Sequence, residues 1–166
     1  LFRSLGHTVT EVPHYLDGEA FQDAFLTLWA FSAATIAAQI AQVAGVDPRK
    51  VGILEPWTLD LADWYATLPS DALEKSLVVL GDATKQSAQF HKEYDVCLSP
   101  VSSNPPPKLG EFAPTLPFDT LMDRSYKQGL FTPTANATGE PAMSVPLGLS
   151  SAGLPIGSHF QAGLGR

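Results

Sequence analysis

Two pairs of adjacent serines are the hydroxyl groups whose spacing comes closest to a nucleophilic site, Ser102-Ser103 and Ser150-Ser151. A serine nucleophile needs a base to activate it and N–H donors that stabilise the oxyanion. Ser102-Ser103 precedes Asn104 and three prolines, and it lacks the flanking glycines that would let a substrate oxygen approach the backbone closely. Ser150-Ser151 falls in a predicted turn between two strands, where serine is common. We therefore predict no catalytic residue in this chain.

The histidines and the cysteine show no pattern typical of a metal or redox site. No histidine has a carboxylate or cysteine at ligand spacing or lies in an HExxH-like motif, so we expect no metal site and no cofactor. Surface or half-buried structural positions are predicted for His7, His14, His91 and His159. Cys97 lies in an apolar strand segment, the setting of a buried and unreactive thiol. A single cysteine excludes an internal disulfide and is typical of a reducing cytoplasm.

The composition and net charge of the chain argue against a nucleic acid or a membrane as its binding partner. The 166 residues are 45% hydrophobic, enough for a buried core, and carry a formal net charge of −7 with scattered Lys and Arg. An acidic chain without a basic patch argues against a nucleic-acid partner. The longest apolar segment, 18–44, is interrupted by Ser32, Thr35, Gln39 and Gln42. We interpret it as a buried helix or helix pair and not as a membrane span, which needs about 20 uninterrupted apolar residues.

Helical and strand signals alternate along the chain, which predicts an α/β fold. Helices are expected at 18–44, ended by Gly45, and at 58–66, 70–94, 118–129 and 132–138. The helix at 70–94 is expected to be capped by Ser70 and to bury a face made of Leu73, Leu77, Leu80, Thr84 and Ala88. Short strands are expected at 8–12, 95–98, 142–145 and 156–161, of which the second is predicted to be buried.

Both ends of the sequence look cut. It begins LFRSLGHTV, without a methionine or the basic and apolar regions of a signal peptide. It stops at SHFQAGLGR, just after a predicted strand. We therefore expect residues 1–166 to be a single fragment of a longer protein. Exposed apolar surface and self-association are expected where the missing part would pack.

The densest Gly and Pro punctuation lies between Phe131 and Gly157, in FTPTANATGEPAMSVPLGLSSAGLPIG. This run resembles the C-terminal signature of the amidase-signature family, in which Asn-x-x-Gly-x-Pro leads through Ser-x-Pro-x-Gly to Gly-Leu-Pro-x-Gly. The segments YDVCLSPV and PPPKLG resemble a strand and loop of the same family. GILEPWT is similar to amidases of the 6-aminohexanoate-cyclic-dimer hydrolase type. The resemblance implies the C-terminal portion of a mixed β-sheet flanked by helices.

The resemblance also implies a function. The longer protein would be a serine amidohydrolase that acts on a small linear or cyclic carboxamide, with its Ser-Ser-Lys residues upstream of this chain. This chain would supply walls of the substrate pocket from two segments, comprising Val101 and Ser102 in one and Phe131, Thr132, Ala135 and Asn136 in the other. A structural interpretation stays open for two of these residues: Thr132 would cap a helix and Asn136 would hold a turn.

At one position this sequence departs from the motif of a related group of enzymes, and the difference bears on the substrate. Amidotransferase A subunits that use glutamine place an aspartate two positions before the phenylalanine of this motif, where this sequence has Gly129. The missing carboxylate disfavours a substrate with a free α-amino group. The alternative to an enzyme fragment is a non-catalytic binding or interaction module with an amidase-like fold. A Gly-Ser-Ser-Gly stretch and a lysine in the longer reading frame would distinguish the two.

Overall fold

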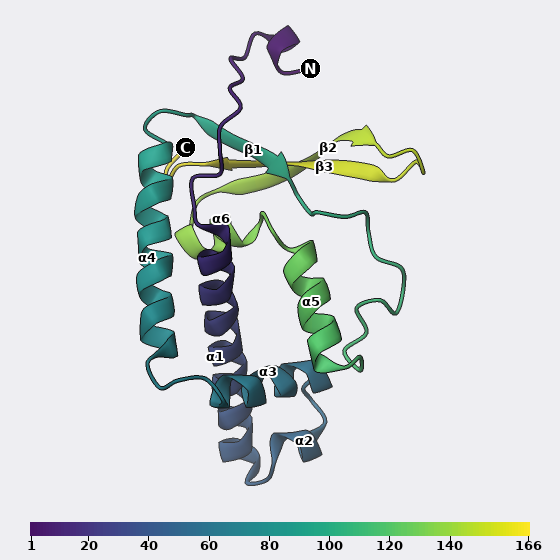
Figure 1. Ribbon diagram of the computed structural model, residues 1–166. Coiled ribbons are helices and arrows are strands. Elements are labelled where there is room, and N and C mark those ends of the chain that lie inside the picture. Colours follow the sequence, from purple (N-terminus) through teal and green to yellow (C-terminus); the bar gives the residue numbers. More distant parts are fainter.

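The computed structural model describes residues 1–166 and shows a small sheet with helices packed on one of its sides (Figure 1). The predicted α/β class is confirmed. The helices are α1 Gly18–Ala44, α2 Pro48–Val51, α3 Pro56–Ala66, α4 Ala72–Phe90, α5 Phe118–Gln128 and α6 Pro133–Thr138, preceded by the 3-10 turn η1 Arg3–Leu5. The strands are β1 Val96–Pro100, β2 Ala142–Leu149 and β3 Pro155–Ala162.

The central helix α1 has the bounds that the sequence predicts, as one helix and not as a pair. The Asp17 carboxylate accepts a hydrogen bond from the Ala20 N–H at 3.2 Å, which satisfies a free donor of the first turn. Gly45 ends the helix in a left-handed conformation with φ of 69°. The helix is long and apolar enough to cross a membrane. In this structure it is the helix against which α3 and α4 pack.

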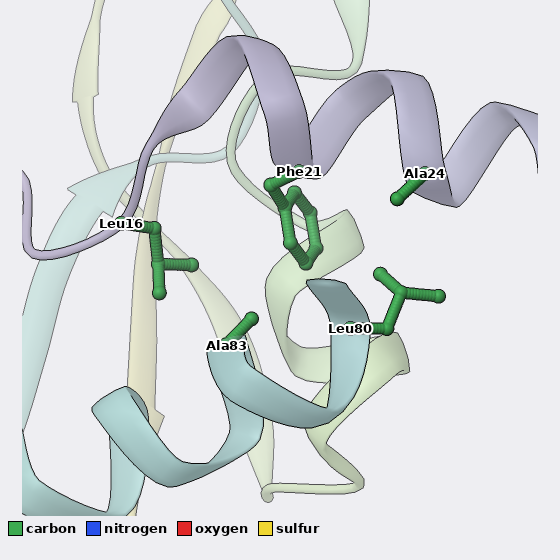
Figure 2. Packing of buried hydrophobic residues seen from close by; sticks show 5 residues of the cluster. All are labelled: Leu16, Phe21, Ala24, Leu80 and Ala83. Atoms are coloured by element: carbon green, nitrogen blue, oxygen red, sulfur yellow. The ribbon is translucent and has the colours of Figure 1, made fainter. Parts of the chain in front are cut away.

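Two apolar clusters hold the helices together. One lies between α1 and α4, where the Phe21 ring is directed towards α4 (Figure 2). Its buried members are Leu16, Phe21, Ala24, Leu80 and Ala83. The second joins α1, α3 and α5 through Ala30, Ala33, Trp57, Leu61 and Leu121. Because α1 contributes mainly alanines, its neighbours approach its backbone closely.

The sheet has the order β1-β3-β2, with both pairs antiparallel. Its inner face carries His159 and Gln161, which are buried. The outer face is apolar and largely uncovered: Val96 is 47%, Leu98 45% and Met143 59% exposed. The expectation that the segment 95–98 is buried is therefore wrong for this chain. The Phe2 ring covers part of this face through an edge-to-face contact with Phe160, but Val96 and Leu98 remain exposed.

Three further expectations are wrong. Residues 8–12 form no strand, because no other strand pairs with them. Helix α4 begins at Ala72, and Ser70 does not cap it. The buried face of α4 comprises Ser76, Leu80, Ala83 and Ser87, whereas Leu77 is 51% exposed, because small residues allow α4 to lie close to α1.

We expect the isolated chain to self-associate through the outer face of the sheet. Leu98 and Met143 lie on either side of Phe160 in the strand register, and both edge strands have an unpaired side. Leu98→Lys combined with Met143→Lys should shift sedimentation toward monomer. Leu77→Lys, on the exposed side of α4, is the matched control. A wild-type chain that stays monomeric at high concentration and binds no apolar dye would contradict this prediction.

Candidate functional site

The structure places the first candidate segment beside the end of α5, which leads into the second candidate segment. Val101 and Ser102 follow β1 and are half-buried. The backbone N–H of Ser103 donates to the Gln128 carbonyl at 3.4 Å, and the Gln128 amide donates to the Asn104 carbonyl at 3.4 Å. Gln128 is the last residue of α5, three positions before Phe131. The loop at 101–104 therefore lies beside the entry to α6.

Helix α6 places its residues at different depths. It starts with Pro133 and ends at Gly139, which has φ of 70° and donates its N–H to the Ala135 carbonyl at 2.9 Å. Ala135 is buried, whereas Asn136 is exposed. Phe131 and Thr132, just before the helix, are half-buried. Of the predicted pocket residues in this segment, Asn136 is therefore the exposed one, Phe131 and Thr132 are partly accessible, and Ala135 is not.

The structural interpretations of Thr132 and Asn136 are wrong. Thr132 stands at the N-cap position, but its backbone is already helical (φ −69°, ψ −26°) and its side chain makes no cap hydrogen bond. Asn136 makes no side-chain hydrogen bond and lies within the helix; the turn after it is held by Gly139. The half-buried Thr132 hydroxyl therefore does not cap the helix, and the exposed Asn136 amide does not hold the turn.

The signature glycine Gly157 is required by close packing. A Cβ atom at this position would lie 2.7 Å from Cγ2 of Val101 and 2.8 Å from Oγ of Ser144. Gly157 thus lets β3 pack directly on the first residue of the loop at 101–104. The glycine of the Gly-Leu-Pro-x-Gly motif consequently fixes the position of a candidate pocket residue.

The two serine pairs lie where the sequence predicts. Ser102 Oγ donates to the Asn104 carbonyl at 3.0 Å in the loop. Ser150 is in the turn of the β2–β3 hairpin, where its Oγ accepts from the Leu154 N–H at 3.1 Å. Neither pair has a basic side chain among its hydrogen-bond partners.

A different serine lies within reach of a base. Ser99 Oγ on β1 is 3.1 Å from Nδ1 of His159 on β3 and 3.0 Å from the Pro100 carbonyl. Burial lowers the pKa of His159, which favours the neutral imidazole that a general base needs. However, no acceptor orients the other ring nitrogen, so the pair lacks the third member of a catalytic arrangement. Sequence analysis missed this pair because its members lie far apart in the sequence.

A buried polar network around Glu140 was also missed. The residue lies between Gly139 and Pro141 in the signature, and its side chain is 3% exposed. Its Oε2 atom accepts hydrogen bonds from Ser87 Oγ at 2.6 Å and from the Gln161 amide, and lies 3.8 Å from Nε2 of His91. His91 and His159 are each 5% exposed, so the expectation of surface or half-buried histidines is wrong for both. The glutamate between Gly139 and Pro141 is the sequence signal that could have indicated this network.

The structure gives no reactive environment to the Cys97 thiol and no ligand cluster for a metal ion. Burial raises the pKa of the half-buried Cys97 thiol, and the Glu140 carboxylate adds to this effect, so the reactive thiolate is disfavoured. No group of three or more His, Cys, Asp or Glu side chains is arranged to hold a metal ion. Two shallow hollows, of about 410 and 520 Å³, lie along α4 and include none of the candidate residues.

The fold and the signature-bearing hairpin together indicate the Amidase family. The sequence profile of the Amidase family matches residues 1–166, and the chain belongs to this family. It is 34% identical to the putative amidase AmiC of Mycobacterium leprae (strain TN) over 166 residues, which are 100% of this chain and 35% of the relative.

Two solved structures show the same fold. The structure of 6-aminohexanoate cyclic dimer hydrolase superposes with a TM-score of 0.82 at 22% identity, over 99% of this chain and 35% of that one. A bacterial aryl acylamidase of the amidase-signature family superposes with a TM-score of 0.61 at 17% identity, over 87% and 30%. The chain thus spans about a third of the length of these proteins.

Proposed function

We propose that this chain is the C-terminal part of a serine amidohydrolase that cleaves a linear or cyclic carboxamide. It supplies walls of the substrate pocket, and the catalytic Ser-Ser-Lys residues belong to the rest of the protein. The contact of the 101–104 loop with Gln128 supports this proposal, because it holds the loop three residues before Phe131, near the second segment that the family resemblance assigns to the pocket. The single half-buried Cys97 supports a reducing cytoplasm as the location.

The residue at position 129 supports a substrate that lacks a free α-amino group. Gly129 has φ of −98°, a conformation that any residue adopts. A Cβ atom there would meet only the Ser125 carbonyl, at an ordinary 3.4 Å. The backbone at this position therefore does not require glycine, and a Cβ atom is accommodated. Because this chain offers no carboxylate at that place, an aryl, alkyl or cyclic amide suits it better than a substrate with a free α-amino group.

The test of the pocket assignment is Thr132→Val in the longer protein. This substitution keeps the shape and deletes the hydroxyl. Because Thr132 makes no cap hydrogen bond, the free energy of unfolding should change by less than about 0.5 kcal/mol. The ratio of kcat/KM for two amides with different acyl groups should change several-fold. An unchanged preference between the two amides would show that Thr132 is not part of the pocket wall.

A further inference from the structure

We infer that Glu140 and a protonated His91 form a buried ion pair that positions helix α6, and with it the proposed pocket wall, against α4 and β3. The pair lies outside the candidate pocket residues, and its role for the pocket rests on the proposed function. His91 follows α4, and Glu140 follows α6. Both side chains are 3% exposed, and Nε2 of His91 lies 3.8 Å from Oε2 of Glu140, an ion-pair separation.

The hydrogen bond on the other ring nitrogen sets the protonation of His91. Nδ1 lies 3.2 Å from the Tyr94 carbonyl oxygen, which only accepts, so Nδ1 carries a hydrogen. A neutral ring has one N–H, which would leave Nε2 bare. That atom is buried, has no hydrogen-bond partner and faces a carboxylate oxygen. Two acceptors in this position repel each other, whereas a proton on Nε2 makes the contact attractive.

The partners of Glu140 make its Oε2 atom a hydrogen-bond acceptor. Ser87 Oγ and the Gln161 amide both donate to Oε2, an arrangement that suits a carboxylate oxygen. The Thr138 hydroxyl lies 3.1 Å from the same oxygen and 3.0 Å from the Thr134 carbonyl, so it donates to one of them. Since Ser87 uses its only hydrogen on Glu140, the Tyr15 hydroxyl, 3.3 Å away, donates to Ser87.

His91 is the one cation available to balance this charge. The titratable groups around Glu140 are His91 from α4, Tyr15 from the segment before α1 and Cys97 from β1. Burial raises the pKa of Tyr15 and of Cys97, so both are neutral at neutral pH. An unbalanced carboxylate at this depth would be costly, and an imidazolium beside it offsets part of that cost.

The network connects elements that are far apart in the sequence. Tyr15 precedes α1, Ser87 lies in α4 and His91 directly follows it, and Gln161 lies on β3. Glu140 itself lies in the turn between α6 and β2. The end of β3 also packs on the histidine, because a Cβ at Gly163 would lie 3.1 Å from Cβ of His91. Displacing Glu140 would therefore loosen the end of α6 from both neighbours.

The first test measures the protonation of the histidine rings in the 166-residue chain by ¹⁵N–¹H NMR at neutral pH. His91 should show hydrogens on both ring nitrogens. His159, equally buried at 5% exposure but without a carboxylate partner, should show a neutral ring and serves as the internal control. A neutral His91 ring in the wild-type chain overturns the proposal.

The second test is a double-mutant cycle with His91→Gln and Glu140→Gln. The two changes should be coupled by roughly tenfold or more in the unfolding equilibrium constant. His159→Gln combined with Glu140→Gln should be additive. Additive behaviour of the first pair overturns the ion pair; where a variant fails to fold, the ring protonation of the wild-type chain decides.

The positioning role is tested with Glu140→Gln in the longer protein. If the variant has a raised KM and a changed preference between two amides with different acyl groups, the positioning role is supported. An ion pair seen by NMR together with unchanged KM and preference overturns the positioning role and leaves the pair standing. If the longer protein hydrolyses no amide, the proposed function fails and the positioning role with it, while the ring measurement still decides the ion pair.

Discussion

The isolated 166-residue chain is expected to release no product from a chromogenic anilide, whereas the longer protein should hydrolyse it. Ser102 and Ser150 bond to backbone groups, and Ser99, within reach of His159, lacks a third group to orient the imidazole. Enzymes accelerate such reactions by about 10⁶-fold or more, so the loss should be complete within detection. A fluorophosphonate probe should likewise leave the chain unlabelled.

Two results would contradict this expectation. Turnover by the isolated chain that Ser102→Ala or Ser151→Ala abolishes would show that a serine pair is catalytic. Probe labelling that Ser99→Ala removes would instead identify the Ser99–His159 pair as a working nucleophile and base. His159→Gln is the companion variant, because it should remove labelling at Ser99 and leave labelling at the other serines.

Gly157→Ala is expected to lower the free energy of unfolding by about 1–3 kcal/mol. The added methyl group would lie 2.7 Å from Val101 Cγ2 and 2.8 Å from Ser144 Oγ, so the Val101 and Ser144 side chains or the backbone of β3 must shift. Gly148→Ala is the matched control in the same hairpin, because no atom lies within 4 Å of its Cβ position. Chemical denaturation of both variants measures the difference, and equal effects would show that the contact at Gly157 is unimportant.

Local sequence signals predicted much of this fold. Asp17 and Gly45 lie at the two ends of α1, and the structure reproduces the predicted range. The same holds for Gly139 at the end of α6 and for the strands of the hairpin, which are longer than predicted at both Leu149 and Pro155. These features depend on neighbouring residues only, and they are therefore readable from one sequence.

Features that depend on distant elements were not predictable. The alternation at 8–12 satisfies the local rule for a strand, but a strand needs a partner. The helical pattern of α4 favoured Leu77 for its buried face, whereas Ser87 is fully buried because Glu140 receives its hydrogen bond across the fold. Residues of the candidate site follow the same division: the signature revealed Thr132 and Gly157, and only the structure revealed Ser99, His91 and Glu140.

The strand order has a consequence for synthesis on the ribosome. β3 is the central strand and pairs with both others, yet it is the last of the three to be made. At roughly 5–20 residues per second, β1 waits on the order of several seconds after it is made before Pro155–Ala162 exists. During that time the apolar Val96 and Leu98 lack the strand that pairs with them here, so completion of this part of the sheet waits for the last residues of β3.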